Sequence, residues 1–383
     1  MKRQIRNTQR VGVLNNHLVN YPTPTNISYH WGYGSMAGRM RVVQMVTGVF
    51  LAMHYAPNVA RAFDSVEHIM REVEYGWRIR YMHANGASYF FLVRNRHRAR
   101  GRYYGSYATP REQRWSTGVI RYLRVMGTGF MGYVLPFGQM SMWGATVITS
   151  LASARPGVGT ERVAWLWGGF AVENATLNRF YAIHYRRPFL IAGRALLHRV
   201  RLHGEGVGSG NPLGVDGNAD RTRFYPYFYV KDRRGRRRRW MRYSRSVYYA
   251  PNMLGHADNY IEANAMVTPN HIVPEWYFRP YYGILRSVPH KLRGVRAMIR
   301  AIRRRGTRPF TNTSEVRSAT FRPIYKQRFW RFVVTVVRLG WVGQKVVAYP
   351  YVELGRRGTR YYFAYRVVLR PVRGRREAQL MRA

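Results

Sequence analysis

Two pairs of histidines with the same spacing place the strongest constraint on the fold of this chain. His83 and His97 lie fourteen residues apart, and so do His184 and His198. Fourteen residues are close to four turns of an α-helix, so both members of a pair face one side of their helix, roughly 21 Å apart along its axis. Two such helices side by side offer two stacked His–His sites. Each site could hold a flat metallocofactor with two axial imidazoles.

Four glycines repeat this spacing. Gly34 and Gly48 lie fourteen residues apart, as do Gly118 and Gly132. Glycine is required where a macrocycle presses on a helix, because any Cβ would clash with it. One such pair often arises by chance, and core histidines with packing glycines explain a single pair equally well. The four pairs together favour a helical bundle with two cofactor sites.

The composition taken alone indicates a different class of protein. The chain has 383 residues, with 64 basic residues against 17 acidic ones and a net charge of +47. This balance is typical of nucleic-acid-binding proteins, including ribosomal ones. The mean hydropathy is −0.39, and no stretch of about 20 uninterrupted apolar residues is present. Cysteine is absent, which excludes disulfides, thiolate metal sites and cysteine nucleophiles.

Long and specific motifs run along most of the chain. They include NNHLVNYPTPTNISYHWGYGS (15–35), QMVTGVFLAMHY (44–55), SVEHIMREVEYGWRIRYMHANGAS (65–88), GYVLPFGQMSMWGATVITS (132–150), WLWGGFAVENATLNRFYAIH (165–184) and NHIVPEWYF (270–278). In these segments the chain resembles mitochondrial cytochrome b, the quinone-handling subunit of respiratory complex III. The photosynthetic counterpart is split into two chains, so the undivided chain most resembles the mitochondrial form.

The resemblance implies an all-α membrane protein with eight transmembrane helices. Residues 1–210 would form an N-terminal four-helix bundle that binds haem, and residues 211–383 a C-terminal part of four helices that contributes the quinol site. The expected spans are 33–54, 77–104, 112–134, 179–203, 228–247, 290–309, 322–341 and 349–372.

The same resemblance implies two non-covalent b-type haems. One iron would be held by His83 and His184, and the other by His97 and His198. The four glycines of the repeat, Gly34, Gly48, Gly118 and Gly132, would give the macrocycles room. Arg80 and Arg100 stand where the family has arginine and would pair with haem propionates. The alternative for these two is that each is an interfacial arginine that extends its charge to the membrane surface.

The resemblance implies a quinol-oxidation pocket between the loop with the tetrapeptide Pro274–Tyr277 and residues 132–150. Glu275 is a carboxylate in a mostly apolar stretch, where burial raises the pKa and suits acceptance of a proton from quinol. The residues that the resemblance assigns to this pocket are Glu275, Tyr277, Tyr133, Trp143 and Gly144. Phe137 replaces the usual tryptophan of the family, and we expect it to alter packing more than chemistry.

A second pocket, for quinone reduction, is implied by His203, Asp232, Lys231 and Ser35. A histidine and an acid near the two carbonyls of a quinone can deliver protons as electrons arrive. The alternative is a salt bridge that only holds a loop. Residues 204–223 are rich in glycine, and this loop is two residues longer than is usual in the family.

The implied function is that of the catalytic cytochrome b subunit of quinol–cytochrome c oxidoreductase, active only within its complex. It would oxidise ubiquinol at one pocket and pass electrons through both haems to quinone at the other, coupled to proton translocation. The expected partners are a Rieske iron–sulfur protein, a c-type cytochrome and other complex III subunits, in a dimeric complex that spans the mitochondrial inner membrane. No nucleic acid is expected. The alternative, a basic organellar nucleic-acid-binding protein of the ribosomal type, rests on charge alone.

Arginine departs from the family pattern at many positions where the family carries leucine or isoleucine. Examples are Arg39, Arg41, Arg94, Arg96 and Arg98, and the run Arg236 to Arg239. A charge at the centre of a bilayer costs at least about 2.5–3.5 kcal/mol, and leucine is scarce. A reassigned codon or an unedited transcript would place arginine where the working protein has leucine. A deliberately solubilised relative is the alternative, although such a design would mix acids with bases.

Overall fold

The protein is almost entirely helical, as the sequence predicts. The computed structural model describes residues 12, 15–16, 19–109, 111–203 and 220–382. Its long helices are α3 (Tyr33–His54), α5 (Gly76–Tyr103), α6 (Glu112–Val134), α9 (Asn174–His203), α10 (Tyr227–Tyr249), α13 (Pro323–Val342) and α14 (Tyr351–Ala364). The shorter ones are α4 (Val59–Arg71), α7 (Gln139–Thr149), α8 (Gly159–Trp167), α11 (Arg279–Arg286), α12 (Lys291–Arg303) and α15 (Arg370–Arg382).

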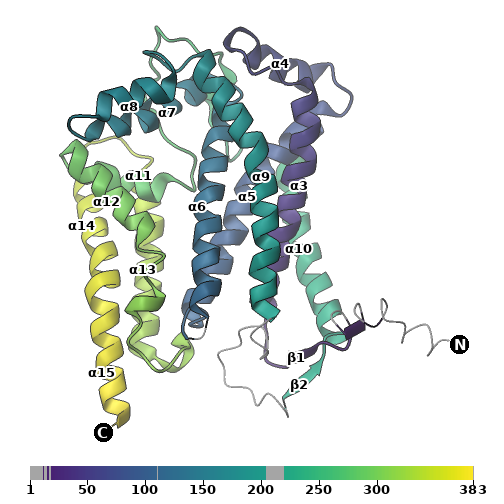
Figure 1. Cartoon of the computed structure of the whole chain (residues 1–383), viewed down its shortest axis with the longest axis vertical. Helices are drawn as coiled ribbons and strands as arrows, with labels where there is room; N and C mark the ends of the chain where they lie inside the picture. The colour runs from purple at the N-terminus through teal and green to yellow at the C-terminus, as the bar shows by residue number, and fades with distance from the viewer. Residues whose placement is uncertain (1–11, 13–14, 17–18, 110, 204–219, 383) are drawn as a thin grey trace, which may run out of the picture.

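Most helix ends agree with the expected spans, and three differ. Helix α9 begins at Asn174 rather than at 179, because Leu177 and Phe180 pack into a buried cluster below α7. Helix α12 ends at Arg303 rather than at 309, ahead of a glycine and a proline that do not continue a helix. Helices α14 and α15 are joined by a π-helical turn at 365–369 and form one rod that reaches residue 382 rather than 372 (Figure 1).

Four helices of the N-terminal half form a bundle, in which α3 packs along α5 and α6 packs along α9. Methionines fill its centre, since Met36 and Met40 on α3 are almost completely buried. The same cluster contains Tyr243 from α10 and Tyr277 from the segment before α11. The two halves of the chain therefore share one core. The division expected at residue 210 lies outside the described residues.

The C-terminal helices form a second layer beside the bundle (Figure 1). Helix α11 packs on α13 and α12, and α13 packs on α14. Their buried side chains are mainly aromatic, and Phe332 stacks on Tyr365 with ring centroids 4.5 Å apart. This layer positions the segment 274–278 against α5, where Trp276 bonds to Ser88 and Tyr277 stacks on Phe91.

Different structures cover the two ends of the bundle. Helices α4, α7 and α8 lie at one end, and a two-stranded antiparallel sheet lies at the other (Figure 1). The sheet pairs β1 (Pro22–Pro24) with β2 (Arg221–Arg223), with Thr23 opposite Thr222. It holds the segment before α3 next to the segment before α10, and so brings residues from both halves of the chain together at this end.

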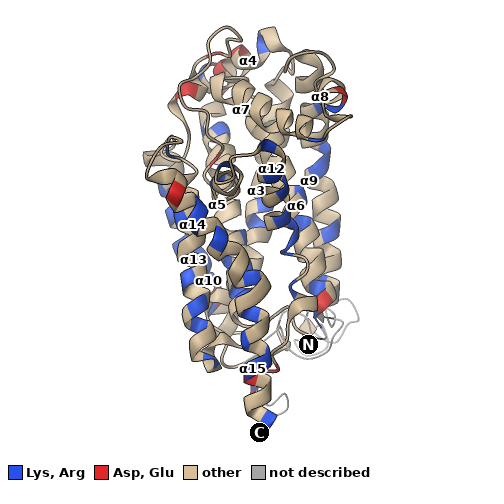
Figure 2. Cartoon of the chain, turned by 90° about the vertical axis from the view of Figure 1, so that its left-hand side faces the viewer, with Lys and Arg blue, Asp and Glu red and all other residues tan. Residues whose placement is uncertain are grey.

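Basic and acidic residues are distributed differently over the helices. Figure 2 shows lysine and arginine along the whole length of the helices, whereas the few acidic residues lie mostly near helix ends and in the covering segments. Among the helices of the described part of the chain, none combines the length and the apolar composition that crossing a membrane requires.

Candidate functional site

The four repeated histidines face the inside of the N-terminal bundle from two helices. Helix α5 carries His83 and His97, and α9 carries His184 and His198. The rings of His83 and His184 lie side by side, with centroids 6.4 Å apart and planes inclined by 74°. His97 and His198 are also close enough to interact electrostatically. The structure therefore brings together the histidine pairs that the spacing predicts.

Each repeated glycine lies opposite one of these rings. An added Cβ would lie 3.1 Å from Cε1 of His83 at Gly48, 3.5 Å from Cε1 of His97 at Gly34, and 3.6 Å from Cε1 of His198 at Gly118. At Gly132 the added Cβ would overlap the ring of His184. The glycines of α3 thus face the histidines of α5, and those of α6 face the histidines of α9. A side chain at any of these positions would enter the space beside an imidazole.

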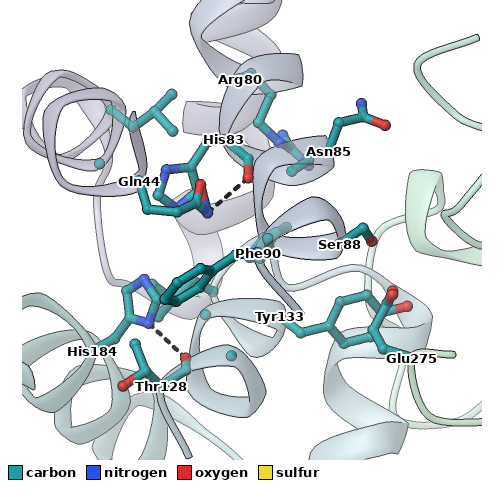
Figure 3. A pocket seen from close by; sticks show the side chains of 18 of the residues that line it. Gln44, Arg80, His83, Asn85, Ser88, Phe90, Thr128, Tyr133, His184 and Glu275 are labelled. Carbon is teal, nitrogen blue, oxygen red and sulfur yellow. Dashed lines mark hydrogen bonds between the residues drawn. The ribbon is translucent and has the colours of Figure 1, made fainter. Parts of the chain in front are cut away.

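Three of the four imidazoles have an oxygen acceptor near Nδ1. Thr47 Oγ1 lies 2.8 Å from Nδ1 of His83, and Thr117 Oγ1 lies 3.1 Å from Nδ1 of His198. His184 bonds through Nδ1 to the main-chain oxygen of Thr128 at 2.9 Å (Figure 3). An Nδ1–H fixed in this way leaves Nε2 as the nitrogen that can bind a metal.

The residues therefore fit an axially ligated haem iron. Two imidazoles with free Nε2 atoms meet across the bundle, and the glycines leave room beside them. No group of three or more His, Cys, Asp or Glu side chains that could hold a metal ion occurs among the described residues. The four histidines would hold the iron, and the macrocycle of a haem would bring the remaining ligands with it.

The two arginines assigned to haem propionates occupy different surroundings. Arg80 lies one turn before His83 and lines the cavity beside it (Figure 3). Arg100 lies one turn after His97, with one guanidinium nitrogen 3.4 Å from Nδ1 of that ring and its Cζ 5.2 Å from the centre of the Trp31 ring. Both are placed near the candidate ligands, at opposite ends of α5.

One cavity connects the His83–His184 level with the Pro274–Tyr277 segment. It has a volume of about 300 Å³. Both histidines line it, together with Gly48, Gly132 and Glu275. Figure 3 shows the imidazoles at one side and Tyr133 with Glu275 at the other. A ligand in this cavity would contact both the His83–His184 pair and the carboxylate of Glu275.

Glu275 has the electrostatic properties of a proton acceptor. Burial raises the pKa of its carboxyl to about 7, although the nearby Arg279 favours the ionised form. The ring of Tyr277, which also lines the cavity, stacks on Phe91 with centroids 3.9 Å apart. The neighbouring Trp276 donates from Nε1 to Ser88 Oγ at 3.0 Å. These two aromatic contacts fix the segment on α5, so the position of the carboxylate is well defined.

Trp143 and Gly144 lie outside the lining of this cavity. The indole of Trp143 donates to Gln139 Oε1 at 3.1 Å and to the main-chain oxygen of Asn264 at 3.3 Å. Gly144 has open space at its Cβ position. Phe137, by contrast, is buried in the cluster that contains Val134 and Leu177, as expected for a packing residue. The roles assigned to Trp143 and Gly144 stay predictions.

Three of the four residues assigned to the second pocket meet near the start of α3. Ser35 Oγ donates to the main-chain oxygen of Gly32 at 3.0 Å, and a Cβ on Gly32 would lie 3.3 Å from Oδ1 of Asp232. Lys231 Nζ donates to the main-chain oxygen of Ile27 at 2.9 Å. His203 is the last residue of α9, and its side chain lies outside the described residues. The proposed salt-bridge alternative for this loop also stays open.

Thr47 and Thr117 are site residues that the sequence analysis did not single out. Each stands immediately before a repeated glycine, so the dipeptide Thr–Gly occurs at 47–48 and again at 117–118. Gln44, one turn before Gly48, donates from Nε2 to the main-chain oxygen of His83 at 3.0 Å (Figure 3). The repeated dipeptide was the signal available in the sequence.

The chain is similar to known proteins over most of its length. Residues 18–206 match the family description Cytochrome b/b6/petB, and residues 262–363 match Cytochrome b(C-terminal)/b6/petD. The cytochrome b of Phytophthora megasperma is 56% identical over 97% of this chain and 96% of its own length, and that of Marchantia polymorpha is 56% identical over 96% and 90%. A chain of a hyperthermophilic respiratory Complex III superposes with a TM-score of 0.92 at 27% identity, covering 99% of this chain and 100% of its own. The chain belongs to the cytochrome b family.

Proposed function

We propose that this cytochrome b is the subunit of a quinol–cytochrome c reductase that oxidises ubiquinol at one pocket and reduces quinone at a second. The observation that carries this proposal is the single cavity that reaches from the His83–His184 level to Glu275. Family membership implies binding of b-type haem. The histidine geometry supports two haems, one held by His83 and His184 and one by His97 and His198.

The haems would supply one-electron carriers whose axial imidazoles tune their potential. The protein's own residues would bind and orient quinol between the 132–150 segment and the Pro274–Tyr277 segment. As quinol loses an electron to the iron–sulfur partner, its hydroxyl proton would pass to the carboxylate of Glu275. Tyr133, Tyr277 and their aromatic neighbours would keep water away from the ring of the quinol.

The second pocket would lie at the opposite end of the bundle. Ser35, Lys231 and Asp232 gather there, beside the sheet that joins the two halves. Cations surround the carboxylate of Asp232, namely Arg236, Arg239, Arg39 and Lys231. Together with His203, Asp232 would give protons to the quinone as it is reduced. Because protons are released at one end of the bundle and taken up at the other, the two reactions would build a gradient across a membrane.

This function requires partner proteins. The chain has no cysteine to bind an iron–sulfur cluster, so a Rieske iron–sulfur protein and a c-type cytochrome would complete the circuit. We infer a location in the mitochondrial inner membrane from the 56% identity to the cytochromes b of Phytophthora megasperma and Marchantia polymorpha. The resemblance to the family implies a dimeric complex. The alternative of a nucleic-acid-binding protein is not favoured, because it explains the charge alone and none of the paired histidines and glycines.

A redox titration of the purified complex tests the proposed function. We expect a reduced-minus-oxidised spectrum with two b-type components of different midpoint potential. Quinol should reduce one component through the first pocket when the partner iron–sulfur protein is present. A complex that contains this chain and shows one b-type component, or none, would refute the two-haem circuit. Retention of the chain on nucleic acid at physiological salt would favour the alternative.

A further inference from the structure

The hydroxyl groups of Thr47 and Thr117 occupy equivalent places on opposite helices of the bundle. Thr47 lies on α3 and contacts His83 on α5, and Thr117 lies on α6 and contacts His198 on α9. Each threonine directly precedes the glycine that faces the same ring. Thr47 is buried. The same local arrangement is therefore built twice, once at each candidate haem level.

The direction of these hydrogen bonds follows from the other bond of each hydroxyl. Thr47 Oγ1 donates to the main-chain oxygen of Val43 at 2.6 Å, and Thr117 Oγ1 donates to that of Arg114 at 3.0 Å. A hydroxyl has one hydrogen to donate and two lone pairs that accept. With its hydrogen committed to the helix, each threonine can only accept from Nδ1–H of the histidine. The tautomer of the ring is thereby fixed with Nε2 free.

We propose that Thr47 and Thr117 are positioning residues that tune the two haems separately, through His83 and His198. The inference rests on the proposed function, since it assumes that Nε2 of each ring binds iron. An acceptor at Nδ1 increases the basicity of a ligating imidazole and fixes the orientation of its ring. A more basic ligand favours the oxidised iron, so each threonine lowers the midpoint potential of its haem. Neither threonine touches the reacting atoms.

Valine tests this role because it has nearly the shape of threonine without the hydroxyl. In the intact complex, we expect Thr47→Val to raise the midpoint potential of the haem at the His83 level and leave the other haem unchanged. Thr117→Val should raise the potential of the other haem alone. Thr47→Ser, which keeps a hydroxyl, should restore the original potential. The electron paramagnetic resonance signal of the oxidised haem, which reports the ligand field, should shift in the same variants.

Thr335→Val is the matched control. Thr335 lies on α13 in the C-terminal layer, and its hydroxyl donates to the main-chain oxygen of Arg331 at 2.8 Å, as the other threonines do to their own helices. Both potentials should stay unchanged. A shift in Thr335→Val as large as that in Thr47→Val would overturn the assignment, because the loss of any helical hydroxyl would then change a haem potential.

The outcomes separate this inference from the proposed function. Wild-type complex with two haems and unshifted potentials in both valine variants would refute the threonine assignment alone. Wild-type complex without haem would refute the proposed function. Selective loss of the haem at the His83 level in Thr47→Val, with haem retained in Thr47→Ser and Thr335→Val, supports the assignment. A hydrogen bond to the second nitrogen of a ligating histidine typically contributes about 10- to 100-fold in metal affinity.

An independent observation concerns the arginines buried between the helices. Arg94 is 7% exposed, points into the bundle from α5, and leaves its Nε without a hydrogen-bond acceptor. The cations Arg121, Arg98 and Arg41 are close enough to repel its charge. Arg41 and Arg121 also have a buried Nε without an acceptor. The centre of the haem bundle thus holds a cluster of like charges, to which the described ion pairs contribute no carboxylate.

Other arginines have the partners that a buried guanidinium requires. Arg322 is 4% exposed and forms an ion pair with Glu377 at 2.7 Å. Its Nε donates to the same carboxylate, also at 2.7 Å. Burial of a charge is tolerated when a counter-charge and hydrogen bonds accompany it and is strongly unfavourable when they do not. The structure therefore divides the buried arginines into a class with partners and a class without.

We infer that leucine occupies positions 41, 94 and 121 in the protein as it is made, and arginine occupies position 322. Leucine is ordinarily among the commonest residues, yet it occurs 21 times here against 59 arginines, since five of the 64 basic residues are lysines. An apolar side chain at position 94 would pack against Phe90 and Tyr122, which Arg94 contacts, without an unpaired charge. Reading of an arginine codon as leucine, or editing of the transcript, would each produce this result.

Mass spectrometry of the native protein, cleaved at aromatic residues rather than at arginine, tests the inference. Peptides that cover 94 and 121 should carry leucine, and those that cover 322 should carry arginine. Arginine at 94 and 121 would overturn the inference. Leucine at 322 would overturn the use of ion pairing to separate the two classes of arginine, because Arg322 has an ion-pair partner. Sequencing of the transcript then distinguishes the two sources, since a leucine codon in the RNA indicates editing and an arginine codon indicates altered decoding.

Discussion

Gly132 and His184 face each other so closely that a Cβ on the glycine would overlap the imidazole ring. The glycine belongs to α6 and the histidine to α9, and both line the cavity that leads to Glu275. The contact holds α6 and α9 at a separation that only a residue without a side chain permits. Space for a cofactor beside the ring therefore depends on this glycine and on Gly48, its counterpart on α3.

Substitution of either glycine by valine should prevent haem insertion. In Gly48→Val or Gly132→Val, a branched side chain would occupy the space beside the ring, and overpacking cannot be relieved without moving a helix. The b-type absorbance per complex should fall by about half if one of two haems is lost. Gly38→Val is the matched control on α3, because its Cβ position is open. Normal haem content in both test variants would show that these glycines serve helix packing and are not required for haem binding.

Replacement of single histidines by leucine should remove haems in a fixed pairing. His97→Leu and His198→Leu should lose the same spectral component, and His83→Leu and His184→Leu should lose the other. The reason is that the rings of His83 and His184 already lie 6.4 Å apart across the bundle. Difference spectra of the four variants check this directly. If His83→Leu and His198→Leu lacked the same component, the antiparallel pairing would be wrong.

Asp232→Asn should slow quinone reduction at the second pocket without slowing quinol oxidation at the first. The substitution keeps the size of the side chain and removes a proton donor that sits among four cations. The two half-reactions can be measured separately in one preparation, each with the other pocket inhibited. Asp64→Asn on α4 is an exposed control at the opposite end of the bundle. Equal slowing of both half-reactions would indicate that Asp232 supports the fold.

The arrangement of the histidines and glycines could be predicted from the sequence because helical periodicity alone decides which residues share a face. The hydrogen bonds of Thr47 and Thr117 to the histidines could not be predicted in this way. A hydroxyl inside a helix normally bonds back to its own backbone, as both of these do. Whether its free lone pair meets an imidazole depends on the distance to the next helix, which the sequence does not contain.

Two other features could not be predicted from the sequence. The rod of α14 and α15 extends ten residues past the expected end, because the arginines of 370–376 hide its periodicity. The motif predicts a role for Trp143 at the quinol pocket, and the structure shows that its indole donates to Gln139 Oε1 and to the main-chain oxygen of Asn264. Neither partner can be deduced from the spacing of residues around Trp143.

Quinol oxidation should depend on pH with an apparent pKa of about 7. Burial raises the pKa of the Glu275 carboxyl to about 7, and only the ionised form can accept a proton. The rate should therefore rise with pH up to about 7 and level off above it. Because the folded chain holds this proton more tightly than the unfolded chain, the contribution of Glu275 to stability falls as the pH rises from about 4.3 to about 7. A rate that falls with rising pH in this range would contradict the role of Glu275 as a base.

Glu275→Gln should remove this pH dependence and slow quinol oxidation selectively. Glutamine keeps the size and most of the hydrogen bonding of the side chain but cannot accept the proton. General-base catalysis typically contributes about 10²–10⁴-fold, and we expect the low end or less because water or Tyr133 can take over part of the transfer. Electron transfer from quinol through the second pocket to the haem at the His97 level should be unchanged, since that pocket lies at the other end of the bundle. Both half-reactions must be measured with the iron–sulfur partner present. Equal loss in both would mean that Glu275 holds the segment 274–278 in place, and the assignment of this segment to proton transfer would fail.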